Sequence, residues 1–276
     1  DLGARFGITK HDNLREVLCG GRYFITASTG LNGYLYVFDI STNQKLQEVV
    51  NGEPILGVSL SHAGNNIAVY GPRNTKIWDI TRSCHTVSVP NPVGYGIMAL
   101  GFTIDDKVLF ACLENGMVQR IFLDNVNPAW EATQALGKQR ADCGFPTCAS
   151  FNANCSLLAI AYDEGPVAIL NITSNGFSDE WTRSSFKQEI KNPNSIKFLS
   201  WDAFSWSLLG VYQNGCVFKW CSHDGELKYL DDQVTGLACG PDGRFFVTSH
   251  ADGKLKVRKQ EDFSLRQRFS ERSVAV

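Results

Sequence analysis

The stretch NGYLYVFD, residues 32–39, contains the features on which the fold prediction rests. It begins with an Asn-Gly pair, which is typical of the tight turn of a β-hairpin because Gly adopts positive φ without steric cost. The apolar residues that follow, Tyr34 to Phe38, lead to an aromatic residue and an Asp. A short apolar segment bounded by a turn predicts a β-strand.

The same combination of turn and strand end recurs along the chain. The pairs are Asn32-Gly33 with Phe38, Asn115-Gly116 with Phe122, Glu164-Gly165 with Leu170, Asn214-Gly215 with Trp220 and Asp252-Gly253 with Arg258. Another unit ends in Trp78-Asp79 and has Asn74 in place of the Gly, and we expect the turn to survive there because Asn tolerates positive φ. The strand ends at 38, 78, 122, 170, 220 and 258 are 40, 44, 48, 50 and 38 residues apart, which is the range of propeller blades.

This period predicts the fold class. A four-stranded antiparallel sheet of this size cannot bury its own faces, so neighbouring sheets must stack around an axis. We predict an all-β fold, a β-propeller of about six four-stranded blades, with type I′ turns at the Asn-Gly and Asp-Gly pairs. The predicted blades cover residues 13–50, 54–91, 95–134, 146–190, 194–231 and 233–270 of a single domain, 1–276.

The last residues of the sequence bear on how many blades the intact ring has. Residues 271–276 look like the first strand of another blade, which suggests a piece of a larger WD-repeat-like array of seven or more blades. Alternatively, residues 1–12 supply a strand that closes a six-bladed ring, since only a closed ring removes the exposed strand edges.

Composition and charge exclude several classes of protein. Lys and Arg number 26 and Asp and Glu 28, so the formal charge is −2 and no overall positive field attracts nucleic acid. The sequence has no apolar run of about 18 residues and no signal segment, and we predict no membrane insertion. Nine scattered cysteines do not form the even framework of a secreted mini-protein, so we expect a reducing, cytoplasmic location.

The sequence contains no convincing catalytic or metal-binding pattern. The pairs Cys143/Cys148 and Cys216/Cys221 share a spacing but have no C-x-x-C and no His cluster beside them. Each of the five histidines is interpreted as a solvated turn residue; they are His11, His62, His85, His223 and His250. We therefore predict no catalytic residue, no cofactor and no metal, and interpret Asp231-Asp232 as ordinary loop polarity rather than part of a hydrolase.

Two local features stand out near the C-terminus. The fifth predicted blade is rich in aromatic residues, among them Trp201, Trp206 and Trp220, which we interpret as packing between blades. Lys254, Lys256 and Arg258 alternate along one strand and share a face, with their charged ends expected in water. The alternative is a contact of these cations with an acidic partner or with a neighbouring blade.

Several motifs resemble the WD-repeat family: Phe38-Asp39, Trp78-Asp79, the turn at 240–243, and Asp252-Gly253 with the following KLKV. The Gly-His pair typical of the family is absent, so its buried Asp-His-Ser/Thr-Trp hydrogen-bond network cannot be complete in any blade. Residues 151–162 and 236–249 are also similar to the C-terminal WD-repeat region of fungal NACHT-type, NOD-like signalling ATPases. This resemblance implies a sensor that binds a protein partner or non-self ligand, with an ATPase module upstream, because this sequence has no P-loop.

We therefore predict a non-catalytic module for protein interaction or ligand sensing. Its binding face is expected where the turns between second and third strands meet the loops that lead into each blade. The candidate partner-binding residues are Leu31, Asn32, Arg73, Glu114, Asn115, Glu164, Gln213, Asn214 and Asp252. The alternatives are a scaffold subunit of a stable complex and, less favoured, a propeller hydrolase or lyase with a site in the central channel.

Overall fold

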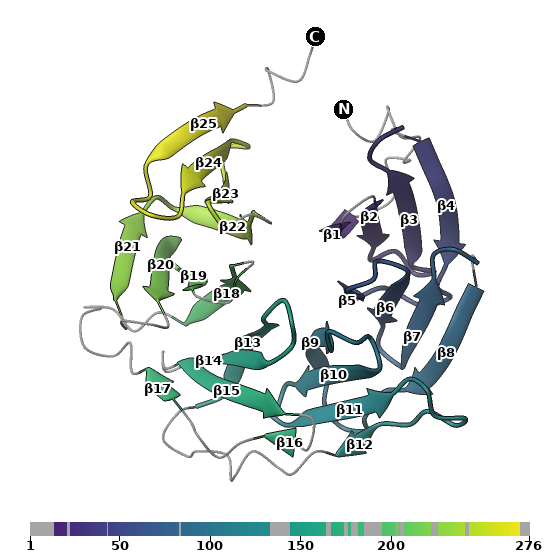
Figure 1. Cartoon of the computed structure of the whole chain (residues 1–276). Coiled ribbons are helices and arrows are strands. Elements are labelled where there is room, and N and C mark those ends of the chain that lie inside the picture. Colours follow the sequence, from purple (N-terminus) through teal and green to yellow (C-terminus); the bar gives the residue numbers. More distant parts are fainter. Residues whose placement is uncertain are drawn as a thin grey trace. The chain divides into compact units, whose positions relative to one another are not determined.

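The computed structural model describes most of the 276 residues (Figure 1). The described ranges are 14–20, 23–42, 44–82, 84–132, 144–163, 167–173, 176–177, 182–184, 195–202, 204, 207–221, 226–240 and 243–270. The regular elements in these ranges are all β-strands. Among the described residues there is no helix of the length and hydrophobicity needed to span a membrane. Residue contacts divide the chain into two compact units, with 114–116 grouped with the second unit.

Unit 1 contains three antiparallel sheets, each built from consecutive strands. The first is β1 (Leu14–Gly20), β2 (Tyr23–Ser28), β3 (Tyr34–Asp39) and β4 (Gln44–Val50). The second is β5 (Gly57–Leu60), β6 (Asn66–Tyr70), β7 (Asn74–Asp79) and β8 (Cys84–Pro90). The third is β9 (Ile97–Phe102), β10 (Val108–Leu113), β11 (Val118–Phe122) and the short β12 (Glu131–Ala132).

Unit 2 contains three further sheets of the same kind. The fourth sheet is β13 (Pro146–Phe151), β14 (Leu157–Tyr162), β15 (Val167–Thr173), β16 (Gly176–Phe177) and β17 (Thr182–Ser184). The fifth is β18 (Ile196–Trp201), β19 (Ser207–Tyr212), β20 (Cys216–Cys221) and β21 (Leu227–Asp231). The sixth is β22 (Val234–Cys239), β23 (Phe245–His250), β24 (Leu255–Lys259) and β25 (Leu265–Phe269). In the fourth sheet two short strands, β16 and β17, both pair with β15 where a single fourth strand was expected.

The core of each unit lies between its sheets. In unit 1, residues of β2 and β3 such as Ile25 and Val37 pack with Ile67 and Val69 of β6 in one cluster. In unit 2, Ala159 of β14 and the residues of β18 to β20 form another. Middle strands such as β3, β14 and β19 bury consecutive residues, so both faces of their sheets need a neighbouring layer and the core of each unit lies between its sheets.

Most of the described aromatic residues of the fifth sheet pack between sheets, as the sequence predicts. Trp201, Phe218 and Trp220 are buried in the cluster between the fourth and fifth sheets. The indole of Trp201 also donates to the Ser150 carbonyl oxygen of the preceding sheet at 3.0 Å. Phe204 is 60% exposed, and Trp206 lies outside the described residues. The packing interpretation therefore holds for the strand residues.

The turns between second and third strands differ from the type I′ turns expected. The glycines of these turns have positive φ, +55° at Gly33, +84° at Gly215 and +75° at Gly253. The Asn or Asp before each Gly does not, whereas a type I′ turn needs positive φ at both central residues. The amide of Gly215 donates to the Tyr212 carbonyl at 2.9 Å, which fits a type I turn closed by a left-handed Gly. The prediction was right for the glycines and wrong for the turn type, because residues with a Cβ avoid the left-handed region.

Candidate interaction surface

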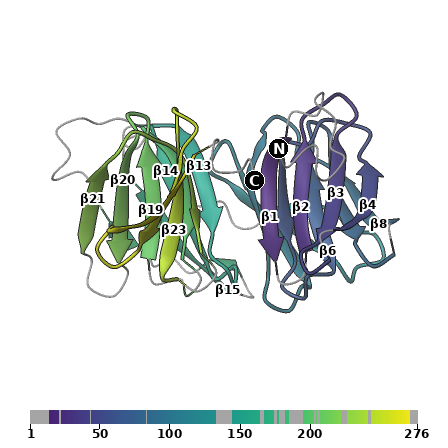
Figure 2. The same cartoon turned by 90° about the horizontal axis from the view of Figure 1, so that it is seen from above.

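The predicted partner-binding residues lie in the turns between second and third strands. In unit 1, the β2–β3 turn contains Leu31 and Asn32, and the β6–β7 turn contains Arg73. The β10–β11 turn contains Glu114 and Asn115. In unit 2, the β19–β20 turn contains Gln213 and Asn214, and the β23–β24 turn contains Asp252. All of them are exposed except the half-buried Asn115. Glu164 lies outside the described residues. Figure 2 shows the strands of each unit standing roughly upright, so that these turns gather at one end of each unit.

In unit 1 the β2–β3 turn is tied to the chain that leaves β4. The Asn51 amide donates to the Gly33 carbonyl at 2.8 Å, and the Gly52 amide donates to the Asn32 carbonyl at 2.7 Å. The next hairpin repeats the first of these links, because the Asn91 amide donates to the Arg73 carbonyl at 2.7 Å. Each exposed turn is therefore held by the loop into the following sheet.

The β6–β7 turn is stabilised by a buried carboxylate from outside its hairpin. Glu53, 3% exposed, accepts hydrogen bonds from the Arg73 and Asn74 amides, each at 3.1 Å. The expectation of positive φ at Asn74 was wrong, because Asn74 is the first residue of β7. Pro72 and Arg73 form the turn instead, and the Gly71 amide donates a hydrogen bond to the Asn74 carbonyl at 3.0 Å. Pro favours negative φ, and Glu53 satisfies the amides that the turn leaves unpaired.

Three exposed apolar side chains lie on turns and loops at the same end of unit 1 as Arg73. Leu31 is 88% exposed, Val93 98% and Tyr95 51%. Val93 and Tyr95 follow Asn91 in the β8–β9 loop, next to the β6–β7 turn. We call Leu31, Arg73, Val93 and Tyr95 the unit 1 rim. Val93 and Tyr95 were not among the residues predicted from the sequence, although the Asn-Pro and Gly turn residues around them mark an exposed loop.

In unit 2 the corresponding turns use their polar side chains locally. The Asn214 carboxamide oxygen accepts the Cys216 amide at 3.0 Å, and the Asp252 carboxylate accepts the Lys254 amide at 3.1 Å. The Val234 amide donates to the Gly215 carbonyl at 2.9 Å and ties the β19–β20 turn to the start of β22. Asn214 and Asp252 thus stabilise their own turns, as Asn and Asp commonly do.

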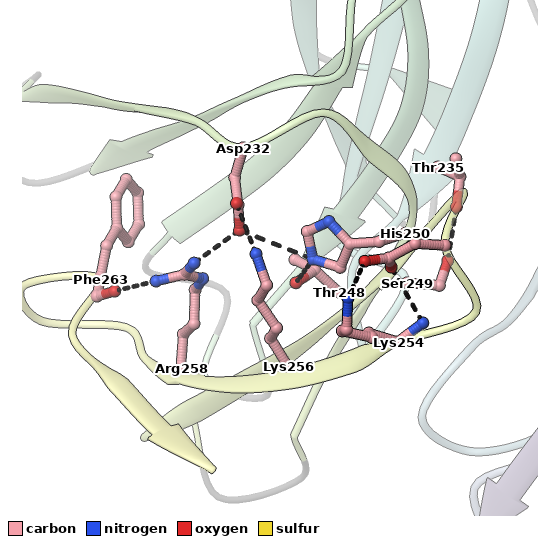
Figure 3. Close-up of polar contacts among 10 residues, drawn as sticks. Asp232, Thr235, Thr248, Ser249, His250, Lys254, Lys256, Arg258 and Phe263 are labelled. Carbon is pink, nitrogen blue, oxygen red and sulfur yellow. Dashed lines mark hydrogen bonds and ion pairs between the residues drawn. The ribbon is translucent and has the colours of Figure 1, made fainter. Parts of the chain in front are cut away.

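A charged cluster joins the β21–β22 loop to the sixth sheet (Figure 3). Asp232 accepts a hydrogen bond from the Lys256 ammonium at 2.6 Å and from the Arg258 guanidinium at 2.5 Å. The side chains of Lys256 and Arg258 are 13% and 11% exposed. Arg258 also donates to the Phe263 carbonyl at 2.9 Å. The prediction that these two charged ends lie in water was wrong, because Asp232 compensates them inside the sheet; only Lys254, paired with Asp252, is half-exposed.

His250 belongs to the same cluster. Its ring lies 3.0 Å from the Thr248 hydroxyl and 3.5 Å from the Asp232 carboxylate, with a side chain 7% exposed. The interpretation of His250 as a solvated turn residue was therefore wrong. Burial and the Lys256 charge lower the pKa of His250, while Asp232 opposes them in part. A neutral imidazole at neutral pH follows.

The pKa of Asp232 reflects opposing effects. Partial burial raises it, but hydrogen bonds from Lys256 and Arg258, and their charges, outweigh burial and leave the pKa of Asp232 below its usual value. The carboxylate is therefore ionised at neutral pH and acts as the centre of the cluster. Among the described residues no group of three His, Cys, Asp or Glu side chains is placed to hold a metal ion.

Comparisons with known proteins concern the repeat family and the fold. Residues 215–258, from Gly215 to Arg258, match the family model WD40, "WD domain, G-beta repeat". The β-propeller domain of Cps50 (Swd1) from Myceliophteria thermophila resembles the chain with a TM-score of 0.71, covering 94% of this chain and 90% of that chain. The protein has a six-bladed β-propeller fold. The identity is 11%, so this likeness concerns the fold alone, and no curated protein matches the chain.

The all-β propeller prediction is thus confirmed, and the WD resemblance is supported where the family model matches. The segment that matches the family model ends at Arg258, the position that corresponds to the aromatic strand end Phe38 of the first unit. An Arg at that position needs a counter-charge when it is buried, and Asp232 supplies it. The predicted relation to fungal NACHT-type ATPases gains no support from these matches.

Proposed function

We propose that the propeller is a non-catalytic module that binds a protein partner through the unit 1 rim. Propellers with WD repeats are generally protein-interaction modules, which supports the class of function. The observation that carries the proposal is the rim itself: three exposed apolar side chains and a cation at one end of unit 1, on turns and loops held by backbone hydrogen bonds. Aromatic and Arg side chains on a preorganised surface are typical of binding hot spots.

The rigidity of the rim matters for affinity. Glu53 holds the Arg73 turn, and Asn51 and Asn91 hold the loops that carry the neighbouring residues. A surface that is already ordered loses less conformational entropy when a partner binds. The exposed Arg73, 3.5 Å from the Glu53 carboxylate, can contact a partner without unfolding the turn.

The test compares two triple variants in unit 1. The rim variant carries Leu31→Ser, Arg73→Ala and Val93→Ser. The control variant carries Ile104→Ser, Arg82→Ala and Val126→Ser, which remove similar exposed side chains from turns at the other end of the strands. Quantitative affinity purification from an extract of the source cells measures the partners that each protein captures.

We expect the rim variant to capture its partners at least about tenfold less than the wild type, with unchanged thermal unfolding. The control variant should capture them as the wild type does. Equal capture by the rim variant and the wild type, or equal loss in both variants, would contradict the assignment of the surface.

The finer prediction, the sensor region of a fungal NACHT-type ATPase, rests on residues 151–162 and 236–249 alone. It requires a P-loop ATPase module in the parent protein, upstream of this segment. Reading the parent gene on both sides tests it: an isolated propeller reading frame would exclude the sensor role and leave the interaction module.

A further inference from the structure

The sixth sheet buries one of its faces more completely than the other. The second strands of other sheets, such as β10 and β19, bury consecutive residues, whereas burial alternates along β23. The buried Phe246 of β23 lies on the face toward the fifth sheet, where it packs with Leu209 of β19. Val247, the next residue of β23, points to the opposite face, because successive residues of a strand alternate. We call this opposite face the second face of the sixth sheet.

The second face carries apolar residues on all four strands. Val247 pairs with Ala238 of β22 and with Val257 of β24. Leu255 of β24 pairs with Phe269 of β25, and these two side chains are 44% and 37% exposed. Ala238 is also exposed, while Val247 and Val257 are half-buried. An apolar sheet face of this kind is stable when a further layer covers it.

The register of the repeat indicates which layer fits. Val247, Ala159 and Leu209 are each the third residue of the second strand of their sheet. Ala159 and its cross-strand partner Ile169 are buried in the cluster that joins the fourth sheet to the fifth. Leu209 is buried in the cluster that joins the fifth sheet to the sixth. The second face therefore corresponds to the surface that the fourth and fifth sheets each cover with the next sheet.

The fifth and sixth sheets both contact the preceding sheet through their first strand. β18 contacts β13 and β14, and β22 contacts β18 and β19. A first strand follows closely on the last strand of the preceding sheet, as β22 follows β21. Residues 271–276, with the sequence ERSVAV, follow β25 in the same way and lie outside the described residues. Val274 and Val276 alternate with small residues there, a pattern that predicts a strand with one apolar face.

We propose that residues 271–276 pack on the second face of the sixth sheet, over β22 and β23, as the first strand of a seventh sheet. Val274 and Val276 then cover Ala238 and Val247, and removal of these apolar side chains from water stabilises the contact. β24 and β25 stay outside this contact, because β18 and β22 likewise reach the first two strands of the sheet before them. The docking surface goes beyond the proposed partner surface and shares no residue with the unit 1 rim.

The test measures alkylation of single cysteines placed on the second face. Ala238→Cys lies under the proposed strand, and Leu255→Cys, on β24, is the matched position outside it. Each substitution is made in the chain 1–276, in a chain that ends at residue 270, and in the chain 1–276 with Val274→Asp and Val276→Asp. Labelling with iodoacetamide under native conditions, followed by peptide mass spectrometry, gives the rate at each introduced thiol separately from the native cysteines.

We expect Ala238→Cys to react at least about tenfold more slowly in the chain 1–276 than in the shortened chain, because a strand packed over the thiol excludes the reagent. The two Asp substitutions should restore the fast rate, since a carboxylate resists burial against an apolar face. Leu255→Cys should react equally fast in all three chains.

Equal rates at Ala238→Cys in the three chains would overturn the proposal. A rate that is fast in all of them means that residues 271–276 do not dock on the second face. A rate that is slow in all of them means that another part of the molecule covers it.

Discussion

Asp232 shows how one residue determines the state of its neighbours. Its carboxylate lies close to the partly buried Lys256 and Arg258 and to the neutral His250. Its negative charge offsets the desolvation free energy of the two buried cations. Removing one partner of such a group leaves an uncompensated charge, which costs more than the pair contributes.

The substitution Asp232→Asn should lower the free energy of unfolding by about 2–4 kcal/mol at pH 7, since Lys256 and Arg258 then lose their counter-charge in a partly buried site. Urea unfolding between pH 3 and 7 measures this difference. The folded pKa of Asp232 lies below the ordinary Asp value of 3.8, so its stabilisation is present above that value and is lost as the pH falls through the folded pKa.

The exposed Asp252→Asn serves as the comparison, because Asn can still accept the Lys254 amide. It should change stability much less than Asp232→Asn. A loss for Asp232→Asn that is independent of pH would show that the carboxylate acts by shape rather than by charge.

At the residue level, the cations of this cluster could be predicted from the sequence, but the carboxylate that pairs with them could not. Lys256 and Arg258 alternate on one strand and are easily recognised, whereas Asp232 lies 24 and 26 residues before them, in the loop before the sheet. The same holds for Glu53, which is 20 residues from the turn that it stabilises. Periodicity identifies a shared face, but it does not identify which residue of another element approaches it.

At the level of the elements, the hairpin turns follow from their glycines. Gly215 and Gly64 both have positive φ, +84° and +74°, but their surroundings differ. A Cβ at Gly215 would lie 2.6 Å from the Gln233 Cα, in the segment that leads into β22, whereas a Cβ at Gly64 meets nothing within 4 Å. A substitution at Gly64 therefore tests backbone strain alone, whereas one at Gly215 tests backbone strain together with a steric clash.

Gly64→Ala should cost about 1 kcal/mol of unfolding free energy, the price of a left-handed residue with a Cβ. Gly215→Ala should cost about 1–3 kcal/mol more, because the backbone of the next sheet must also move. Urea unfolding of both variants measures the difference. Equal losses of unfolding free energy in the two variants would mean that the Gln233 backbone can move away from a Cβ at position 215 without a cost in stability.

The strands themselves were the most predictable elements. The short apolar run from Leu157 to Ala161 lies in β14, where four consecutive residues are buried; a continuous apolar run of this length predicts a strand covered on both faces. The turn at Pro72-Arg73 was not predictable in detail, because a buried carboxylate from another loop selects it. Local propensity is a weak guide where a distant side chain satisfies the backbone.

At the level of the whole molecule, burial controls the chemistry of the thiols. Desolvation raises the pKa of Cys148 to about 12 and that of Cys239 to about 11, although hydrogen bonds partly oppose the shift. Burial also raises the pKa of Cys155. Since the thiolate is the reactive form, we expect these cysteines to react slowly in the folded protein.

Labelling with iodoacetamide at pH 9, followed by peptide mass spectrometry, should therefore leave Cys148, Cys155 and Cys239 unmodified in the native protein. In urea the same residues should react fully, because unfolding restores solvent and an ordinary pKa. Rapid labelling of any of the three under native conditions would show that its sheet opens without global unfolding.

The number of sheets and the all-β class could be read from the recurring turns and strand ends, because each sheet must hide its apolar faces against another and therefore repeats one pattern. Which loop meets which turn could not be read in this way. The links from Asn51, Glu53 and Asp232 join residues that are near only after the sheets have packed, and the positions of their charges and hydrogen bonds arise from that packing. The exposed surface at the unit 1 rim depends on those tertiary contacts.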